Sequence, residues 1–499
     1  MTAASARAPE GGAPEGGAFA VLRNRPFLFL WLAQVATQIG ANMVLYGLTV
    51  LVRETTDLSS TVSLLFLTFL MPSVLFSALA GVYVDRFDRR LVLVVTNVLR
   101  AAFLVTIFAV DGNIAAVLVL NVVFSTVTVF FAPAEAAMIP VVVPREQLVA
   151  ANGLFTLTIN GAFALGFAFL GPLVVTISGG PAPVILIVTL LYGLAAAICA
   201  TLPSDKPAPR TEGGRLVDLG EAGHAVGGTI GQLREGMAYI RANHSIAWSL
   251  TYLGIAASLV GIVGVLGPGF AQQTLGLAPK DLIVVVLPLG LGIVMGVLLL
   301  NLYGRLFDRR RAIEAGLIAL GVLLIVLTVA GPVSRFLTGV GTRVPVGDFA
   351  SLTSLVGVVV AIAFLAGVAY GIVAISSQTQ LQEDIAEEAR GRVFGVLNML
   401  ISVASIVPII IVGPIADLVG TTGVILTVAI LVLVSGIISM VVRTRVEEQG
   451  RAGGPVVPGI AVDGIGVTLR AQPDPPSQPE ARREPEAPTP KRPRRGKSR

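Results

Sequence analysis

Residues 81–90 read GVYVDRFDRR, and residues 301–310 read NLYGRLFDRR. The two stretches share the pattern Tyr-x-x-x-Phe-Asp-Arg-Arg at an offset of 220 residues. Each is a short basic segment between two long apolar runs. The repeat predicts a chain built from two halves with the same order of apolar segments and polar turns.

The composition places most of the chain in a lipid bilayer. Of its 499 residues, 54% are hydrophobic and 13% are charged, and the mean hydropathy is +0.85. A soluble protein of this length carries about twice that charged fraction. Apolar runs of about 20 residues recur along nearly the whole chain, each long enough to cross a bilayer as a helix. We therefore predict an all-α membrane protein rather than a soluble protein with a buried core.

The apolar runs predict twelve membrane-spanning helices in two pseudo-symmetric halves of six. The spans are expected at 27–51, 60–82, 91–110, 114–137, 150–176, 182–202, 246–272, 281–303, 312–331, 353–377, 392–416 and 420–443. The corresponding domains are a disordered N-terminal tail (1–26), a first six-helix half (27–202), a cytosolic linker (203–245), a second half (246–443) and a disordered basic, Pro-rich tail (444–499).

The basic residues of the loops predict the orientation. Fifteen Arg and Lys residues fall in loops on the linker's side of the membrane, against four on the opposite side. Cytosolic loops carry the excess of positive charge, so both termini are expected in the cytosol. Residues 1–20 contain no apolar signal-peptide core.

The repeat extends beyond the basic loops. Gly171-Pro172 matches Gly413-Pro414 at an offset of 242, and the additional residues of the second half are assigned to a loop at 332–352. Residues 233–244 are expected to form a short amphipathic helix at the membrane surface.

Several classes of function are excluded by missing residues. The chain has one cysteine, Cys199, which rules out a disulfide framework and most metal sites, and we expect neither metal nor cofactor. No His, Cys or paired-acid group supports an enzyme, and no Gly-x-x-x-x-Gly-Lys loop supports direct use of ATP. Six of the nine residues in 491–499 are basic, which favours contact with anionic lipid headgroups over nucleic-acid binding.

The first basic loop resembles the Gly-x-x-x-Asp-Arg-x-x-Arg-Arg signature of the major facilitator superfamily. The resemblance implies a secondary transporter that works by alternating access. Gly81 is then expected to let span two pack against the other half, while Asp85 accepts hydrogen bonds there. The matching residues, and hence the expected conformational switch, are Gly81, Asp85, Arg86, Arg89 and Arg90. In the second copy Asn301 and Arg305 stand at the positions of Gly81 and Asp85. The second copy is therefore expected mainly to set the membrane topology of the chain.

Other segments are similar to the enterobactin-exporter and macrolide-efflux branch of that superfamily. They are residues 133–154, 235–240 and 389–395, and the resemblance covers roughly 20–445. Gly171-Pro172 also resembles the span-five signature of antiporters. The branch implies export of a small amphipathic compound of the drug or siderophore type, and hence a role in drug resistance.

In this superfamily, spans one, four, seven and ten line a central cavity. Polar residues at helical spacing on three of these spans are its candidate lining. They are Gln34, Gln38, Asn42, Asn121, Ser125, Thr128, Tyr370 and Gln378. Hydrogen bonding between helices, without any ligand, is the alternative interpretation.

Proton coupling is the least supported part of this hypothesis. No carboxylate falls near the middle of any predicted span, although proton antiport needs a titrating group in the membrane. The candidate acids for coupling are Glu135, Asp85 and Asp417, all near helix ends. Arg100, which must be paired or hydrated inside span three, is a further candidate. Glu135 and Asp85 are its possible partners. A cavity without carboxylates also favours neutral or amphipathic substrates.

The sequence therefore predicts a monomeric, multi-pass exporter in a bacterial inner membrane, with a small-molecule substrate, protons and lipid as its partners and no nucleic acid. A sensor or assembly partner that keeps the transporter fold but does not transport is the alternative, with 446–499 as its docking element. Import also remains open, because helices do not reveal the direction of transport.

Overall fold

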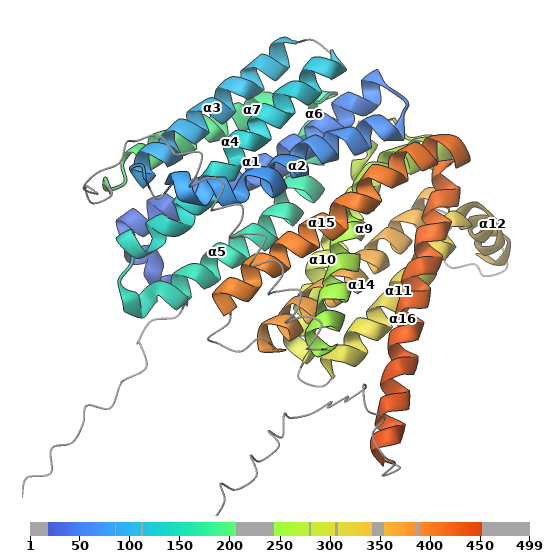
Figure 1. The fold of residues 1–499 in the computed structure, drawn as a ribbon. Helices are drawn as coiled ribbons and strands as arrows, with labels where there is room; N and C mark the ends of the chain where they lie inside the picture. Colours follow the sequence, from blue (N-terminus) through green and yellow to red (C-terminus); the bar gives the residue numbers. More distant parts are fainter. Residues whose placement is uncertain are drawn as a thin grey trace, which may run out of the picture. The chain divides into compact units, whose positions relative to one another are not determined.

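The computed structural model describes residues 18–84, 86–110, 113–205, 244–278, 281–304, 308–341, 354–384 and 390–451. The predictions for residues 1–17 and 452–499 of the two tails, for most of the linker with its amphipathic helix, and for Asp85 concern residues outside this part. Residues 18–23, 25–26 and 444–451, which the predicted disordered tails include, are helical. All regular secondary structure in the described ranges is helical (Figure 1).

The first half contains six spans. Its elements are η1 (Ala18–Arg23), α1 (Arg25–Thr55), α2 (Ser59–Val84), α3 (Arg89–Ala109), α4 (Ile114–Val142), η2 (Arg145–Gln147), α5 (Leu148–Ala162), η3 (Phe163–Leu170), α6 (Gly171–Ser178) and α7 (Ala182–Ala200). Span five consists of α5, η3 and α6 in direct succession, with η3 a π-helical stretch.

The second half repeats this order. Its elements are α9 (His244–Leu275), α10 (Ile283–Tyr303), α11 (Arg309–Thr328), α12 (Ala330–Gly341), α14 (Leu355–Asp384), α15 (Arg390–Val419) and α16 (Thr421–Arg451). Every predicted span coincides with a helix, and in the described residues eleven helices are long and apolar enough to cross a membrane. The remaining span, α15, contributes a shorter apolar stretch, Val403–Val419. The predicted fold class is confirmed.

Local chemistry explains where several helices begin and bend. Asp88 caps α3 by accepting from the Arg90 backbone N–H at 3.0 Å, and Asn113 caps α4 by accepting from that of Ala116 at 3.2 Å. In span five, Pro172 has no N–H and cannot continue an α-helical ladder. The Gly171 N–H bonds to the Gly166 carbonyl five residues back, which gives the π-helical turn.

The expected loop at 332–352 is wrong for its first ten residues, because α12 continues as a helix to Gly341. Its sequence, AGPVSRFLTGVG, mixes small, polar and apolar residues, and such a mixture is typical of a loop. Apolar side chains such as Val333 pack on the cluster formed by Ala330, Val358 and Ile362. This packing stabilises a helix that the composition alone does not indicate.

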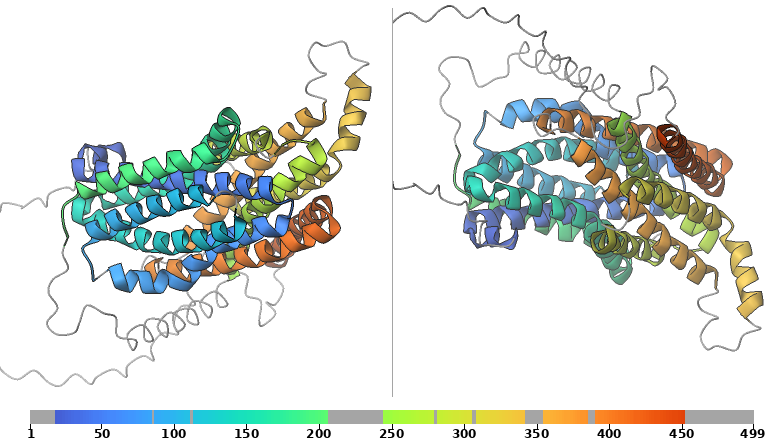
Figure 2. Two further views of the ribbon diagram at one scale, coloured as in Figure 1. Left: turned by 90° about the horizontal axis from the view of Figure 1, so that it is seen from above. Right: turned by 90° about the horizontal axis from the view of Figure 1, so that it is seen from below.

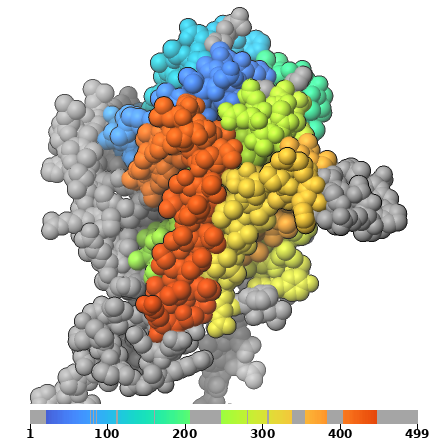
Figure 3. All heavy atoms as spheres, turned by 90° about the vertical axis from the view of Figure 1, so that its right-hand side faces the viewer, coloured from blue at the N-terminus to red at the C-terminus, as the bar shows by residue number. Residues whose placement is uncertain are grey.

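The helices of each half pack in the same pairs. Helix α4 contacts α2 and α3 in the first half, and α14 contacts α10 and α11 in the second. Figures 1 and 2 show the first-half helices, blue to green, as one group and the second-half helices, green to orange, as another. Helix α16 lies along α11 (Figure 3), where a Cβ placed on Gly321 would lie 2.7 Å from the Leu433 Cβ.

In the described residues, the two halves meet mainly where α2 contacts α15 and α9, and where η3 and α6 contact α10. We call the end of the bundle at which α2 ends and α3 begins the linker end, because α7 also ends there and leads into the linker. The other end, at which α1 ends and α2 begins, is the distal end. The largest hydrophobic core joins the halves in the distal part of the bundle, where Tyr46 and Phe66 belong to the same cluster as Leu266 and Ile409.

Candidate functional site

The first basic loop is fixed to the end of span six. Arg89 Nη1 donates to Asp205 Oδ2 at 2.6 Å and to the Ala137 carbonyl at 3.3 Å. Asp88 Oδ2 accepts from the Ser204 hydroxyl, and its Oδ1 accepts from the Asp205 N–H at 3.4 Å. The loop is therefore tied to its own half, while Asp85 lies outside the described residues. The conformational switch stays a prediction.

The Asp88 carboxyl makes the contact between the first basic loop and the end of span six dependent on pH. Partial burial acts to raise the pKa of its carboxyl, but hydrogen bonds from Ser204 and from the N–H groups of Asp205, Leu91 and Arg90 hold the pKa below its ordinary value. A carboxyl whose folded-state pKa is depressed stabilises the fold above its unfolded-state pKa, and this contribution disappears as the pH falls through the folded-state pKa.

We therefore expect Asp88→Asn to lower stability by about 0.3–1 kcal/mol at neutral pH, because asparagine can still cap α3 but lacks the negative charge that the helix N-terminus favours. Thermal unfolding of the purified protein as a function of pH measures this effect. The difference between variant and wild type should shrink on acidification, and an unchanged difference at low pH contradicts the assignment. Glu146→Gln, a change to an exposed acid in η2, is the matched control.

The space around individual glycine residues shows where the two halves approach each other closely. A Cβ added at Gly81, at the linker end of α2, would meet nothing within 4 Å, and the same holds for Gly153 and Gly161 in the first part of span five. Towards the distal end the packing is tight. A Cβ on Gly264 of α9 would lie 2.5 Å from Cζ of the Phe66 ring of α2, and one on Gly413 of α15 would lie 2.6 Å from the Ser59 carbonyl oxygen. In the described residues, the close contacts between halves thus gather at the distal end.

Polar contacts reinforce this distal closure. Arg53 is 3% exposed, and its Nη2 donates to Gln272 Oε1 at 2.5 Å, across the two halves. Its Nη1 donates to the Asp57 carbonyl at 2.9 Å. The candidate coupling residue Asp417 also lies here, at the end of α15, where it accepts from backbone N–H groups at the start of α2.

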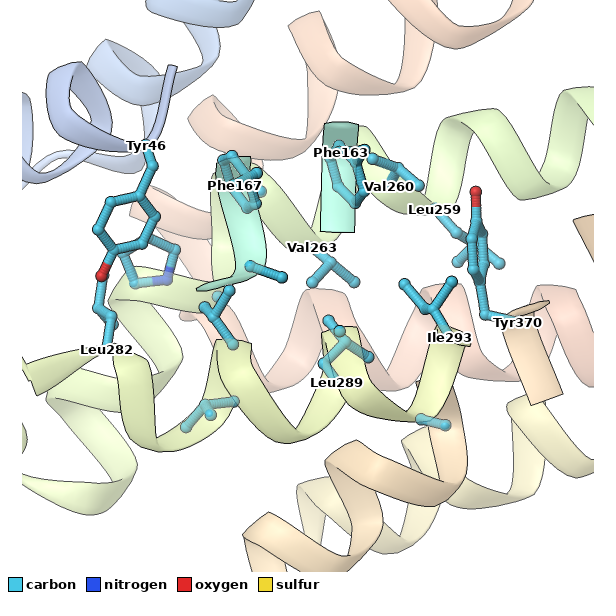
Figure 4. Close-up of a pocket in the computed structure, with 18 of the residues that line it drawn as sticks. Tyr46, Phe163, Phe167, Leu259, Val260, Val263, Leu282, Leu289, Ile293 and Tyr370 are labelled. Atoms are coloured by element: carbon cyan, nitrogen blue, oxygen red, sulfur yellow. The ribbon is translucent and has the colours of Figure 1, made fainter. Parts of the chain in front are cut away.

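A cavity of about 110 Å³ lies between the halves, beside this closed end. It is lined from α1, η3, α9, α10, α11 and α14, almost entirely by apolar and aromatic side chains. In Figure 4, Tyr46 and Tyr370 stand at opposite ends of the cavity, with Phe163, Phe167 and Val263 between them. The Phe163 and Phe167 rings stack at 5.3 Å between centroids.

The cavity suits the apolar body of a small molecule. Stacked aromatic rings offer a face for flat apolar groups, and the two tyrosine hydroxyls offer hydrogen bonds at either end. Drug-sized ligands occupy pockets of roughly 300–1,000 Å³, which exceeds the volume enclosed here. A ligand of that size therefore extends beyond the volume that this cavity encloses.

The predicted cavity residues divide between different environments. Tyr370 lines the cavity. Gln34 instead donates to the Phe155 carbonyl of α5 at 3.4 Å, and Asn121 donates to Thr68 Oγ1 of α2 at 2.9 Å. Asn42 donates within α1 to the Gln38 carbonyl at 2.8 Å. Bonds between helices, the alternative interpretation, are therefore present for Gln34 and Asn121.

Of the other four predicted residues, Gln38 is half-buried on α1, and three lie on α4 and α14. Thr128 donates within α4 to the Phe124 carbonyl at 2.9 Å. Ser125 is buried and Gln378 is half-buried. A lining role for this set, beyond Tyr370, stays a prediction.

Arg100 and Glu135 come together inside the first half. Both are buried, at 2% and 5% exposure, and they interact electrostatically across α3 and α4. Arg100 Nη1 contacts Asn97 Oδ1 at 3.4 Å, and its guanidinium lies 4.3 Å from the centroid of the Phe131 ring. Within the described part of the chain, Glu135 Oε1 has no hydrogen-bond partner. Of the two partners that the sequence allowed for Arg100, Glu135 is the one that the described residues place beside it.

A second buried charge cluster, in the second half, was missed by the sequence reasoning. Glu314 of α11 is 2% exposed and accepts from Ser439 at 3.0 Å and from Arg443 Nε at 2.8 Å, both on α16. Arg310 Nε lies 3.4 Å from Glu314 Oε1. The available signal was an acid inside the predicted span 312–331, with an arginine at the end of the predicted span 420–443. In the described residues, no group of three or more His, Cys, Asp or Glu could hold a metal ion.

The sequence profile described as Major Facilitator Superfamily matches residues 30–407. The chain belongs to the Major Facilitator Superfamily. This superfamily comprises transporters rather than enzymes, so the chain is a multi-pass membrane transporter with bacterial relatives, and the predicted family is confirmed.

Relatives within the Major Facilitator Superfamily include macrolide efflux protein A of Streptococcus pyogenes, 25% identical over 79% of this chain and 90% of that protein. The multidrug efflux pump Tap of Mycolicibacterium fortuitum is 23% identical over 86% of this chain and 98% of the pump. The uncharacterized MFS-type transporter YkuC of Bacillus subtilis is 32% identical, but the match spans only 32% of YkuC and 27% of this chain.

Solved structures of the Major Facilitator Superfamily share the fold. A point mutant of the nucleoside transporter NupG superposes with a TM-score of 0.62 at 13% identity, covering 84% of this chain and 99% of NupG. A point mutant of the peptide transporter POT, in complex with sulfate, gives 0.58 at 12% identity, covering 84% of this chain and 94% of POT. At this identity the likeness concerns the fold alone.

Proposed function

We propose that this chain is a proton-coupled exporter of small amphipathic compounds that works by alternating access as a monomer. The observation that carries the proposal is the cavity between the halves, which is lined by Tyr46, Phe163, Phe167 and Tyr370 and lies beside a closed end. Such a cavity binds an apolar or aromatic body without needing a charged partner. The printed names of two relatives, a macrolide efflux protein and a multidrug efflux pump, support the same substrate class.

The distribution of charge supports an orientation with both termini in the cytosol. The linker end holds Arg86, Arg89, Arg90, Arg309 and Arg310, and such an excess of basic residues is typical of the cytosolic face. With the distal end closed, the conformation is then one that receives substrate from the cytosol. The plasma membrane of a bacterium is the proposed location, with the first half at 27–202 and the second at 246–443.

The Arg100–Glu135 pair is the proposed coupling site. A buried carboxyl beside a buried cation can bind and release a proton, and Glu135 Oε1 has no hydrogen-bond partner. The pair lies among α3, α4 and α7 rather than in the cavity lining, since Tyr192 of α7 also faces Arg100. Proton binding would therefore act on transport by changing the packing inside the first half and not by direct competition with substrate.

Transport in inverted membrane vesicles tests this function. We expect vesicles that contain the protein to accumulate macrolides or lipophilic dyes when a proton gradient is imposed, and to lose them when a protonophore is added. Val263→Trp, which places a large ring in the cavity, should reduce this accumulation. Wild-type protein that moves none of a broad panel of such compounds would contradict the proposal.

A non-transporting sensor or assembly role remains the second candidate, because the relatives' names do not fix the activity of this chain. Deletion of 446–499 separates the two. A transporter keeps its flux without this segment, whereas a docking protein loses its association with partners.

A further inference from the structure

Asp417 caps the start of α2 from the opposite half of the protein. Its Oδ1 accepts from the Ser59 N–H at 2.7 Å, and its Oδ2 accepts from the Ser60 N–H at 2.9 Å. The first N–H groups of a helix have no partner within that helix, and the helix dipole favours a negative charge beside them. In α2 this capping group comes from 358 residues further along the chain. The hydrogen bonds therefore join the two halves directly.

Gly413 lies one helical turn before Asp417 and lets α15 approach α2. It is buried, and a Cβ at this position would lie 2.6 Å from the Ser59 carbonyl oxygen. Contacts below 3.0 Å are essentially never made by real Cβ atoms. The carboxylate of Asp417 reaches the α2 amides because residue 413 has no side chain.

The same spacing occurs at the other end of α2. Gly81 and Asp85 are four residues apart at its linker end, as Gly413 and Asp417 are near the distal end of α15. Among the described residues, a Cβ on Gly81 would meet nothing within 4 Å, whereas Gly413 is in tight contact. One glycine–aspartate pair is thus engaged against the other half, and the glycine of the second pair has open space.

We propose that Gly413 and Asp417 form a latch that holds the distal end closed and must release in every transport cycle. Asp417 is then a positioning residue, which acts by setting the access state rather than by touching substrate. Arg53 interacts electrostatically with Asp417 and donates to Gln272, so it belongs to the same set of contacts between the halves at the distal end. The latch rests on the proposed alternating-access function, but it can be tested on the gate itself.

The test measures the distance across the distal end. Ile177 of α6 and Val329 at the end of α11 are 77% and 43% exposed, lie one in each half, and take no part in the latch. Nitroxide labels on cysteines at these two positions, in the full-length protein with Cys199→Ser in lipid nanodiscs, report opening by double electron–electron resonance. Loss of a helix cap typically changes an equilibrium by about five-fold, so Asp417→Ala should raise the distal-open population by about that factor. Glu146→Ala, which removes an exposed acid in η2 at the linker end, should leave the distribution unchanged.

Gly413→Ala is the second variant, because it pushes α15 away from Ser59 without removing the charge. It should shift the distances in the same direction as Asp417→Ala. Unchanged distance distributions in both variants would overturn the latch. A shifted gate in a protein that moves no compound in the vesicle assay would instead support the latch and contradict the proposed export function.

Discussion

Glu135→Gln should abolish the dependence of efflux on the proton gradient while leaving substrate affinity nearly unchanged. Glu135 is buried inside the first half, faces Arg100, and does not line the cavity. A glutamine has the shape of a protonated glutamic acid but cannot release a proton. The side chain that faces Arg100 therefore stays in the uncharged state. Substrate then equilibrates across the membrane but is not concentrated against its gradient. The measurement is accumulation in inverted vesicles as a function of imposed pH difference, with equilibrium binding of the same substrate measured in parallel.

Glu146→Gln is the matched control. Glu146 is an exposed acid in η2, on the loop that follows α4, and its change should leave coupling intact. Arg100→Gln is an independent test of the same pair, because it removes the cation that favours the charged form of Glu135. This variant should also uncouple transport from the proton gradient. A normal pH-gradient dependence in Glu135→Gln excludes Glu135 as the proton site. Coupling would then have to be sought at another acid.

Most of the fold could be predicted because its signal is local. Each span is a run of about 20 apolar residues, and the bilayer sets that length. The exceptions are segments in which a single residue or tertiary packing determines the secondary structure. Pro172 turns part of span five into a π-helix, and packing against Val358 and Ile362 makes α12 a helix where composition predicts a loop.

The candidate site could be predicted only where chemistry restricts the choice. A charge such as Arg100 within a span needs a nearby partner, and the few acids in the apolar segments leave a short set of candidates that includes Glu135. Polar residues such as Gln34 and Asn121 are different. A stripe at helical spacing shows which face of the helix is polar but not what this face meets, and these two side chains bond to neighbouring helices. The Asp417 contacts have no local signal, because they join residues 358 positions apart.

Glu314→Ala should be the most destabilising single change at the linker end of the second half. Glu314 is 2% exposed and receives Arg443, Arg310 and Ser439. Removing one member of a buried ion pair costs about 3–5 kcal/mol, because the remaining charge loses its partner in a medium of low dielectric constant. Arg310 retains some contact with water, which places the expected loss near the lower end of that range. The midpoint of thermal unfolding in nanodiscs measures it.

The matched control is Glu383→Ala, which breaks the ion pair between Arg309 of α11 and Glu383 of α14. The Glu383 side chain is 57% exposed, and such solvated pairs contribute about 0–1 kcal/mol. A large decrease in the midpoint for Glu314→Ala beside a small one for Glu383→Ala identifies burial, not charge number, as the cause. Equal decreases would contradict that explanation.

The double variant Glu314→Ala/Arg443→Ala distinguishes two origins of the destabilisation. If the cost arises mainly from a buried arginine that has lost its carboxylate, removing Arg443 as well should recover part of the midpoint lost in Glu314→Ala. If the cost arises from lost packing between α11 and α16, the two losses should add. Recovery would show that Glu314 sits at the linker end to hold the arginines of α11 and α16 together, as Asp205 holds Arg89 in the first half. In each half, an acid–base contact would then join two corresponding spans, span three to span six in the first half and span nine to span twelve in the second. The acid and the base would occupy exchanged positions in the two halves.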